Sequence, residues 1–346
     1  MDRTRTPLIV PVFVPHAGCP HRCAFCNQSM ITGASAAPLD PSSIRLQISS
    51  FLEGCRNDTR SSQIAFYGGN FLGISPTRIT DLLSEAARFV AGKRIDGIRF
   101  STRPDTIDSE RLALLDGFPL ETIEIGAQSM DDGVLAKSRR GHTSADTARA
   151  ADLVRGGGFQ LGLQIMVGLP GDGEDVSMET ARRVAALSPA FVRIYPTVVV
   201  AGSLLADWYR NGTYSPWSLD RAVALTARMA GFFRENGIRV IRMGLQATDD
   251  LQPGDSILAG PYHPAFGHLV YARMFLEKAV ALLASRPDIK DGEGTTEVVL
   301  KVHPRAESRF RGMKNENIRK LKERFGLKKI IVQRDASLPE DGIDLL

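Results

Sequence analysis

The sequence predicts an α/β fold, namely a partial or full (β/α) barrel with a small C-terminal α/β appendage. Short apolar segments alternate with amphipathic helical segments along most of the chain, and this order implies a parallel sheet with right-handed crossovers. The chain has 346 residues, of which 43% are hydrophobic, enough for one large core and a second, small domain. Beyond residue 254 the alternation gives way to a loop and a long helix. A doubly wound open sheet would show the same alternation and is the alternative.

Seven segments have the length and apolar content of buried strands. They are residues 8–14, 63–67, 97–101, 122–126, 160–166, 191–194 and 239–243. Six segments between them have apolar residues at helical spacing, namely 42–54, 76–91, 109–115, 143–155, 176–187 and 218–236. Six or more such strand–helix units favour a barrel.

The same patterns divide the chain into three parts. We expect a barrel core over residues 8–250 and an extension of that core over 251–287. A polar, glycine-containing stretch at 288–296 is typical of a linker. The appendage, residues 297–346, is expected to be a basic strand–helix–strand unit with one helix over 308–325.

The N-terminal segment does not look like a signal peptide. Its apolar run, residues 8–14, is too short for the apolar region of a signal peptide and contains Pro11. No stretch is long and apolar enough to cross a bilayer. We therefore expect a cytoplasmic protein with no membrane partner.

Positive charge is concentrated near the C-terminus. Between residues 301 and 334, twelve Lys and Arg face three Glu, which gives a local charge of +9. Because the whole chain has a net charge of +4, the remainder stands at −5. Charge gathered in this way favours a polyanionic partner such as RNA. A solvated charged helix face is the equally weighted alternative.

Three cysteines follow the first predicted strand. The segment G-C-P-H-R-C-A-F-C-N places Cys19, Cys23 and Cys26 within eight residues. In a reducing compartment such a group indicates metal binding rather than disulfides. Three thiolates can ligate three irons of a 4Fe–4S cluster and leave the fourth iron open, in a loop that faces the active-site mouth of a barrel. A structural zinc with His16 or His21 as fourth ligand is the alternative.

The spacing Cys-x3-Cys-x2-Cys, with Phe25 before the last cysteine, resembles the signature of radical S-adenosylmethionine (SAM) enzymes. The resemblance implies that the open iron is chelated by the methionine amine and carboxylate, and that Phe25 lies near the adenine. It also implies reductive cleavage of SAM to a 5′-deoxyadenosyl radical that abstracts hydrogen from the substrate. A low-potential electron donor of the flavodoxin or ferredoxin type is implied as a partner. Cys55 is interpreted as a small packed thiol outside the site.

The end of the second predicted strand fits the same family. Gly68-Gly69-Asn70 resembles the Gly-Gly-Glu motif that hydrogen-bonds the methionine amine. Two glycines let the backbone approach a ligand closely. Asn70 stands where Glu is common, and its carbonyl oxygen can accept a hydrogen bond without adding negative charge.

Four further segments narrow the resemblance. They read R-F-S-T-R-P-D at 99–105, E-I-G-A-Q-S at 124–129, R-G-H-T at 140–143 and I-Y-P-T at 194–197. With these the chain resembles the radical domain of the third Elongator subunit and its bacterial relatives, without the acetyltransferase domain. The resemblance spans residues 11–267 and extends more distantly to oxygen-independent coproporphyrinogen oxidase.

This resemblance implies cofactor-binding roles for four side chains around the nucleoside or the methionine carboxylate. They are Ser101, Gln128, Arg140 and Gln164. The planar guanidinium of Arg140 can hold a carboxylate through two hydrogen bonds, and a surface ion pair is its alternative role. Gln164 alternates with apolar neighbours on a predicted strand, so its amide needs a partner.

Tyr262 and His263 form a compact acid–base pair in the loop before the long helix, and they are the candidate catalytic residues. A proline-fixed turn with a packed Tyr is the alternative. The sequence therefore predicts a radical SAM enzyme whose substrate is RNA or, second, a small molecule. The rival from another class is a non-catalytic RNA-binding module that holds zinc or an Fe–S cluster.

Overall fold

The computed structural model describes residues 7–14, 18–27, 40–55, 61–245, 254–286, 289 and 297–346. The predicted linker at 288–296 lies outside these residues except for Ile289. The chain forms two compact units. Unit 1 contains Met1–Ser218 and Phe233–Tyr262, and unit 2 contains Leu219–Phe232 and His263–Leu346.

Unit 1 is built on one sheet of seven parallel strands. In sheet order these are β1 (Leu8–Val14), β2 (Ser62–Gly68), β3 (Gly97–Thr102), β4 (Leu120–Gln128), β5 (Gln160–Val167), β6 (Phe191–Pro196) and β8 (Arg239–Met243). Sheet neighbours follow one another along the chain without a reversal of direction, so the sheet is not doubly wound. The curled sheet has β1 and β8 at its edges, and the prediction of a partial barrel is confirmed.

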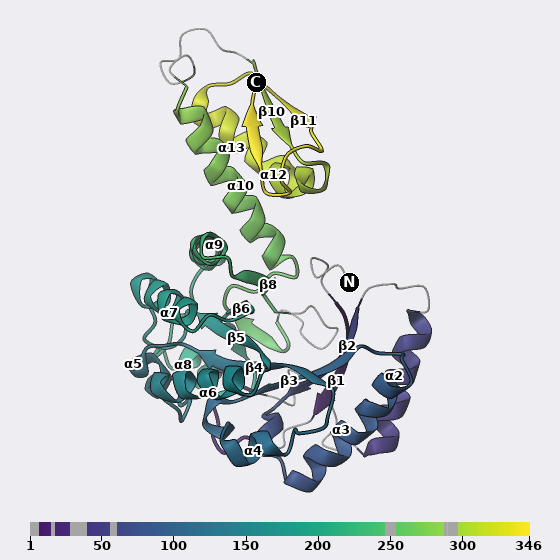
Figure 1. Cartoon of the computed structure of the whole chain (residues 1–346). Coiled ribbons are helices and arrows are strands. Elements are labelled where there is room, and N and C mark those ends of the chain that lie inside the picture. Colours follow the sequence, from purple (N-terminus) through teal and green to yellow (C-terminus); the bar gives the residue numbers. More distant parts are fainter. Residues whose placement is uncertain are drawn as a thin grey trace. The chain divides into compact units, whose positions relative to one another are not determined.

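Helices follow most of these strands and cover the outer side of the sheet (Figure 1). They are α2 (Pro41–Gly54), α3 (Pro76–Ala91), α4 (Ser109–Ala113), α5 (Asp132–Lys137), α6 (Ser144–Gly156), α7 (Glu174–Ala186) and α8 (Leu204–Arg210). The next helix along the chain, α9 (Leu219–Glu235), belongs mostly to unit 2. Helix α3 shows why they form: Pro76 occupies its first turn, and Ile79, Leu83 and Ala86 line one fully buried face. Burial of an aliphatic side chain as large as Leu83 stabilises the fold by roughly 1.5–3 kcal/mol.

The two faces of the sheet differ in chemistry because side chains alternate along each strand. Val10, Phe66 and Phe100 belong to the buried apolar face that packs under the helices. The other face has polar residues in register on adjacent strands, such as Gln164 opposite Arg193. This polar face is the side of the half-barrel that is available for chemistry.

Four short elements lie where the sequence analysis assigned no helix or strand. Strand β7 (Val199–Val200) pairs antiparallel with β9 (Ile257–Ala259), and β9 lies in the stretch after residue 254 that was expected to be a loop. Helices α5 and α8 are similarly short, at six and seven residues. Elements this short have too few positions for a periodic pattern to appear. No helix in the described residues is long and apolar enough to cross a membrane.

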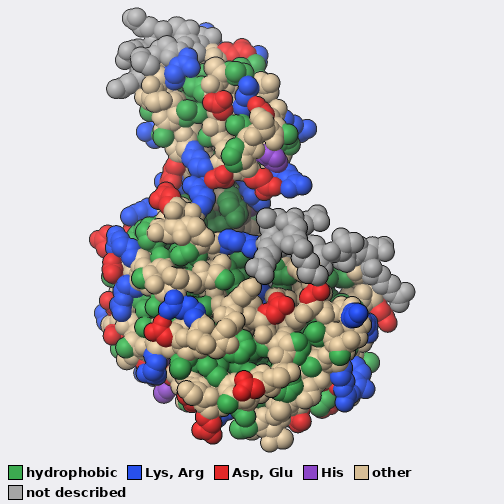
Figure 2. Space-filling view, in the orientation of Figure 1, with side chains coloured by type: hydrophobic (Ala, Val, Ile, Leu, Met, Phe, Trp, Pro, Cys, Tyr) green, Lys and Arg blue, Asp and Glu red, His purple; other side chains and the backbone are tan. Residues whose placement is uncertain are grey.

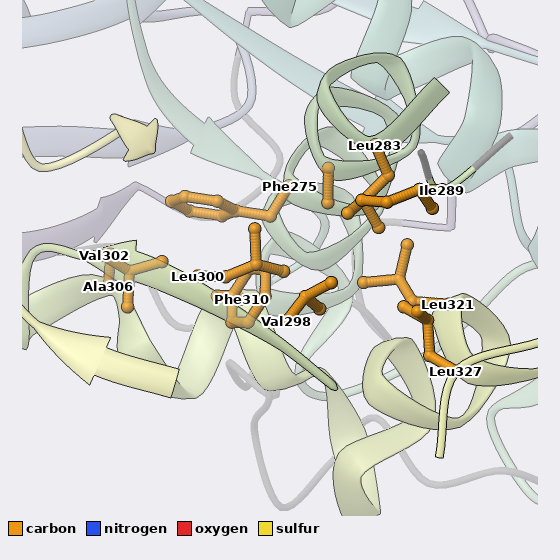
Figure 3. Packing of buried hydrophobic residues seen from close by; sticks show 11 residues of the cluster. Phe275, Leu283, Ile289, Val298, Leu300, Val302, Ala306, Phe310, Leu321 and Leu327 are labelled. Atoms are coloured by element: carbon orange, nitrogen blue, oxygen red, sulfur yellow. The ribbon is translucent and has the colours of Figure 1, made fainter. Parts of the chain in front are cut away.

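Unit 2 has its own sheet and core. Strand β10 (Glu297–Val302) pairs parallel with β11 (Lys329–Arg334) and antiparallel with β12 (Ile343–Leu345). The long helix α10 (Phe266–Ala284), α12 (Glu307–Arg311) and α13 (Glu316–Phe325) cover one face of this sheet. Figure 3 shows Phe275, Leu300 and Phe310 packed together in that core.

The single helix predicted over residues 308–325 is wrong. The structure breaks it into α12 and α13 at Gly312–Asn315, where Gly312, Lys314 and Asn315 have positive φ angles of 69°, 50° and 59°. A right-handed helix cannot continue through left-handed backbone. The apolar spacing alone did not show this break, because the residues on both sides keep a helical period.

Candidate functional site

The cysteine loop, defined here as residues 18–27, contains no helix or strand and is held from outside. Ala24 donates its backbone N–H to Ser138 O (2.9 Å) and accepts from Leu205 N (2.8 Å). Asn27 Nδ2 donates to Ala201 O at 2.7 Å. The loop is therefore fixed by the segments that follow α5 and β7.

The side chain of Asn70 ties the start of this loop to two strand ends. It is 1% exposed, and its Nδ2 donates to Gly18 O at 2.7 Å. Its Oδ1 accepts from Thr102 Oγ1 (2.6 Å), Thr106 Oγ1 (2.8 Å) and Arg103 N (3.0 Å). A glutamate could not donate to Gly18 O, so the Asn found here in place of Glu has a structural reason.

Close backbone contacts complete this arrangement. Gly18 has φ +86°, and a Cβ on it would lie 2.5 Å from Asn70 O. A Cβ on Gly141 would lie 2.3 Å from the His21 ring, so His21 packs directly on the segment after α5. Both positions require glycine because the chain segments touch there.

Two buried guanidinium groups face the sulfur of Cys23. Arg140 Nη1 lies 3.2 Å from Cys23 Sγ, and Arg103 Nη1 lies 3.7 Å from it. Arg103 is oriented by Asp105, whose carboxylate accepts from its Nε at 2.9 Å and from its Nη2 at 3.1 Å. Arg103 Nη2 also donates to Arg140 O, so the two arginines are held as a pair. N–H donors of this kind stabilise an anionic sulfur ligand and influence cluster potential.

The segment Arg140–His142 contains buried polar atoms without a partner among the described residues. These atoms are Arg140 Nε and His142 Nδ1. Ser138 Oγ, two residues before this segment, is a third such atom. Burial, with further contributions from Arg140 and Arg103, lowers the pKa of His142 to about 4, so its imidazole is neutral at physiological pH. Buried polar atoms normally have partners. A bound polar ligand would supply them, and this fits the role expected for Arg140.

The predicted nucleoside-binding side chains meet beside this segment. Gln128 ends β4 with φ +67°, a strained conformation for a non-glycine residue, at a register shift of the sheet. Gln164 Nε2 lies 3.5 Å from Gln128 Oε1, and Arg140 Nη2 donates to Gly126 O at 2.6 Å. Ser101 lies one residue before the end of β3, in register with Glu124 on the polar face. The structure thus brings Gln128, Arg140 and Gln164 together.

The remaining predicted site residues have different surroundings. Phe25 is half-buried and packs against a small cluster that includes Val199, Leu205 and Tyr214. Tyr262 packs against the cluster of Val198, Val200 and Ile257. His263 Nδ1 accepts from Ala265 N at 3.0 Å, a turn contact just before α10. Cys55 ends α2 and is half-buried.

The donor set fits three ligands to an iron–sulfur cluster. All three thiols come from one short loop, and the sulfur of Cys23 is faced by two N–H donors. Within the described residues no three Cys, His, Asp or Glu side chains are gathered into a preformed metal site. Three thiolate ligands without a fourth suit a cluster that keeps one open iron position.

A buried ionic network on the polar face was not anticipated. Glu124 lies between Arg99 (2.5 Å, Nη2 to Oε1) and Arg193 (2.8 Å, Nε to Oε2), and all three are largely buried. Arg193 Nη2 donates to Tyr67 OH at 2.7 Å, and Tyr195 OH lies 3.4 Å from Arg193 Nη1. Burial, reinforced by Glu124, raises the pKa of Tyr67, so the phenol stays protonated. The sequence signal for such a network is the occurrence of polar residues two positions apart within the predicted strands.

Comparison with known proteins agrees with this geometry. Residues 13–184 match the radical SAM superfamily, and residues 189–276 match the radical SAM C-terminal domain. The chain belongs to the radical SAM superfamily and is a radical SAM enzyme.

Individual relatives place it near the Elongator group. It is 26% identical over 240 residues to the tRNA uridine(34) acetyltransferase of Dehalococcoides mccartyi, covering 60% of this chain and 52% of that protein. It is 29% identical over 152 residues to Elongator complex protein 3 of Danio rerio, covering 42% and 28%. The chain therefore spans about half or less of these relatives' length. The archaeal Elp3 of Methanocaldococcus infernus shares the fold, with a TM-score of 0.61 at 19% identity over 80% of this chain and 64% of that one.

The hydrogen bond from Asn70 to Gly18 can be tested through cysteine reactivity. Asn70→Asp keeps the acceptor oxygen but replaces the donor with an oxygen that faces Gly18 O. A buried acceptor left unpaired costs about 1–3 kcal/mol, so the loop should open roughly 10- to 100-fold more often. We expect iodoacetamide to modify Cys23 of the cluster-free protein faster by that factor, as measured by mass spectrometry.

Two controls test whether the effect is specific to the cysteine loop. Cys55 lies on another element and should react at an unchanged rate in the same sample. Asn211→Asp makes the same chemical change at an exposed position whose acceptor bonds to Thr213 survive, and it should leave Cys23 unaffected. An unchanged Cys23 rate in Asn70→Asp would show that this hydrogen bond does not hold the loop.

Proposed function

We propose that this protein is a cytoplasmic radical SAM enzyme that modifies RNA, with Cys19, Cys23 and Cys26 as the ligands of a 4Fe–4S cluster. The observation that supports this most strongly is the cysteine loop fixed beside Arg103 and Arg140, with the ends of β2, β3 and β4 around it. When bound, the cluster supplies an electron for reductive cleavage of SAM to a 5′-deoxyadenosyl radical. A low-potential flavodoxin or ferredoxin would deliver that electron.

The chain's own side chains would bind and orient SAM. Arg140 has a free buried Nε and two further N–H groups for the methionine carboxylate. Gly68, Gly69 and Asn70 would form the wall next to the methionine amine. Asn70 Oδ1 already accepts three hydrogen bonds, so its main contribution is to keep this wall rigid.

Other predicted residues would surround the nucleoside. Gln128 and Gln164 would hydrogen-bond the ribose, Ser101 would add a hydroxyl, and Phe25 would contact the adenine. Tyr262 and His263 are proposed to exchange protons with the substrate through the phenol and the imidazole Nε2, since His263 Nδ1 is engaged in its turn.

RNA is proposed as the substrate class for two reasons. The relatives named tRNA uridine(34) acetyltransferase match this chain over 60% of its length or more in two cases. Residues 301–334 also have the excess of positive charge described above. If the substrate is instead a small molecule, the second experiment below, which measures 5′-deoxyadenosine formation, would show it.

Replacement of any one of Cys19, Cys23 or Cys26 by Ala should abolish the cluster and the reductive cleavage of SAM, because no neighbouring thiolate can substitute. Iron and sulfide analysis and chromatographic measurement of 5′-deoxyadenosine check both effects. Cys55→Ala is the matched control and should retain full cluster content. Loss of the cluster in Cys55→Ala, together with its retention in one of the other three variants, would contradict the ligand assignment.

Unmodified tRNA transcripts should raise the rate of 5′-deoxyadenosine formation at least several-fold over the uncoupled rate, because substrate binding aligns the hydrogen donor. The matched control is a DNA of the same length and sequence. If instead only the small-molecule fraction of a cell extract stimulates the reaction, the substrate is a metabolite rather than RNA.

A further inference from the structure

Unit 2 contains a strand–helix–loop–helix–strand arrangement that the radical chemistry does not use. Strand β10, helix α12, helix α13 and strand β11 follow one another, and the two strands lie side by side and parallel. The loop between the helices is only four residues long, Gly312-Met313-Lys314-Asn315. The matches to the radical SAM models end at residue 276, before this arrangement begins.

This loop has a defined conformation. Gly312 and Asn315, its first and last residues, both have positive φ angles, 69° and 59°. Glycine and asparagine are the residues that enter this region most readily. Asn317 is 5% exposed and fixes the loop from behind, because its Nδ2 donates to Phe310 O and Ala272 O, both at 2.8 Å.

The loop is fixed on its inner side and open on its outer side. The side chains of Met313, Lys314 and Asn315 are exposed. Behind them, Ile318 and Leu321 of α13 pack into the core of the unit, so the loop stands on a rigid base. Exposure combined with rigidity suits a surface that binds a partner without an ordering cost.

Two helices joined by a tight glycine-containing loop, between two strands, characterise the KH class of RNA-binding module. In that class a G-x-x-G loop clamps the backbone of about four nucleotides of single-stranded nucleic acid. The loop here reads G-x-x-N, and Asn315 has the left-handed conformation that a second glycine would adopt.

The positive charges without a carboxylate partner lie on this loop and on the elements that flank it. Seven of the twelve Lys and Arg between residues 301 and 334 are within 4 Å of a carboxylate. Five make no ion pair with a described residue: Arg309, Lys314, Lys322, Arg324 and Lys328. All five lie on α12, the loop, α13 or the turn after it. Figure 2 shows the basic side chains of this unit mixed with acidic ones, so the free cations matter more than the net charge.

We infer that unit 2 is a KH-like module that holds single-stranded RNA, with Gly312–Asn315 as the backbone clamp and the five unpaired cations on the loop and its flanking elements as further phosphate contacts. The choice of RNA over DNA rests on the proposed function. Phosphates would approach the backbone of the loop and the ammonium group of Lys314, and contacts of this kind position a strand rather than read its sequence.

The test is direct binding of a fluorescent uridylate dodecamer, which cannot form a duplex, to the reconstituted holoprotein at 150 mM salt. Met313→Asp with Lys314→Asp places two carboxylates at the loop tip and changes the charge by −3. We expect the Kd to rise at least tenfold. Arg305→Asp with Ala336→Asp also changes the charge by −3 at exposed positions away from the loop, and it should change the Kd less than twofold. Asn315→Gly, which restores G-x-x-G, should keep or tighten binding.

If both double variants that change the charge by −3 lose affinity equally, the clamp is wrong. Such a result would show that binding depends on overall charge and not on the loop. Wild-type protein that does not bind the dodecamer, or binds a deoxythymidylate dodecamer more tightly, would overturn the RNA assignment. Uncoupled cleavage of SAM should be unchanged in every variant. A failure of the radical chemistry would therefore appear in that assay, and a failure of the clamp would appear only in binding.

Discussion

The hydrogen bonds of one buried side chain, Asn70, hold the functional end of the half-barrel together. The cysteine loop has no secondary structure of its own, so its position depends on contacts with the strand ends around it. Asn70 joins Gly18 in that loop to Thr102 at the end of β3 and to Arg103 and Thr106 just after it. Arg103, fixed in this way, meets Cys23 together with Arg140. The side-chain amide of Asn70 therefore links the cysteine loop to the Gly-Gly turn and, through Arg103, to Arg140.

A second constraint shapes the floor of the half-barrel. Charged groups inside a protein are costly unless they are paired and hydrogen-bonded. Glu124 meets this condition between Arg99 and Arg193, with Tyr67 and Tyr195 completing the network. Removal of one partner of a buried pair typically costs 3–5 kcal/mol, so the network is expected to be rigid. Its two arginines, its glutamate and its two phenols lie on the polar face of the sheet.

The sequence was informative wherever structure depends on local pattern. Strand β1 and helix α3 have the predicted bounds because each is a clear apolar or amphipathic run between turn residues. The same reasoning could not show that Asn70 serves the fold, because its partners lie more than 30 residues away. The break at Gly312 was missed for a related reason, since it is fixed by Asn317 and its contact with α10. Long-range hydrogen bonds leave no periodic signal.

The proposed function requires Cys19, Cys23 and Cys26 to hold a cluster that leaves one iron open to SAM. Mössbauer spectroscopy of the enzyme reconstituted with isotopically enriched iron tests it most directly. We expect one of the four irons of the cluster to change its isomer shift when SAM is added, while the three thiolate-ligated irons do not. Four irons that do not respond to SAM, or a preparation that binds one zinc per chain in place of iron, would show that the three cysteines do not hold such a cluster.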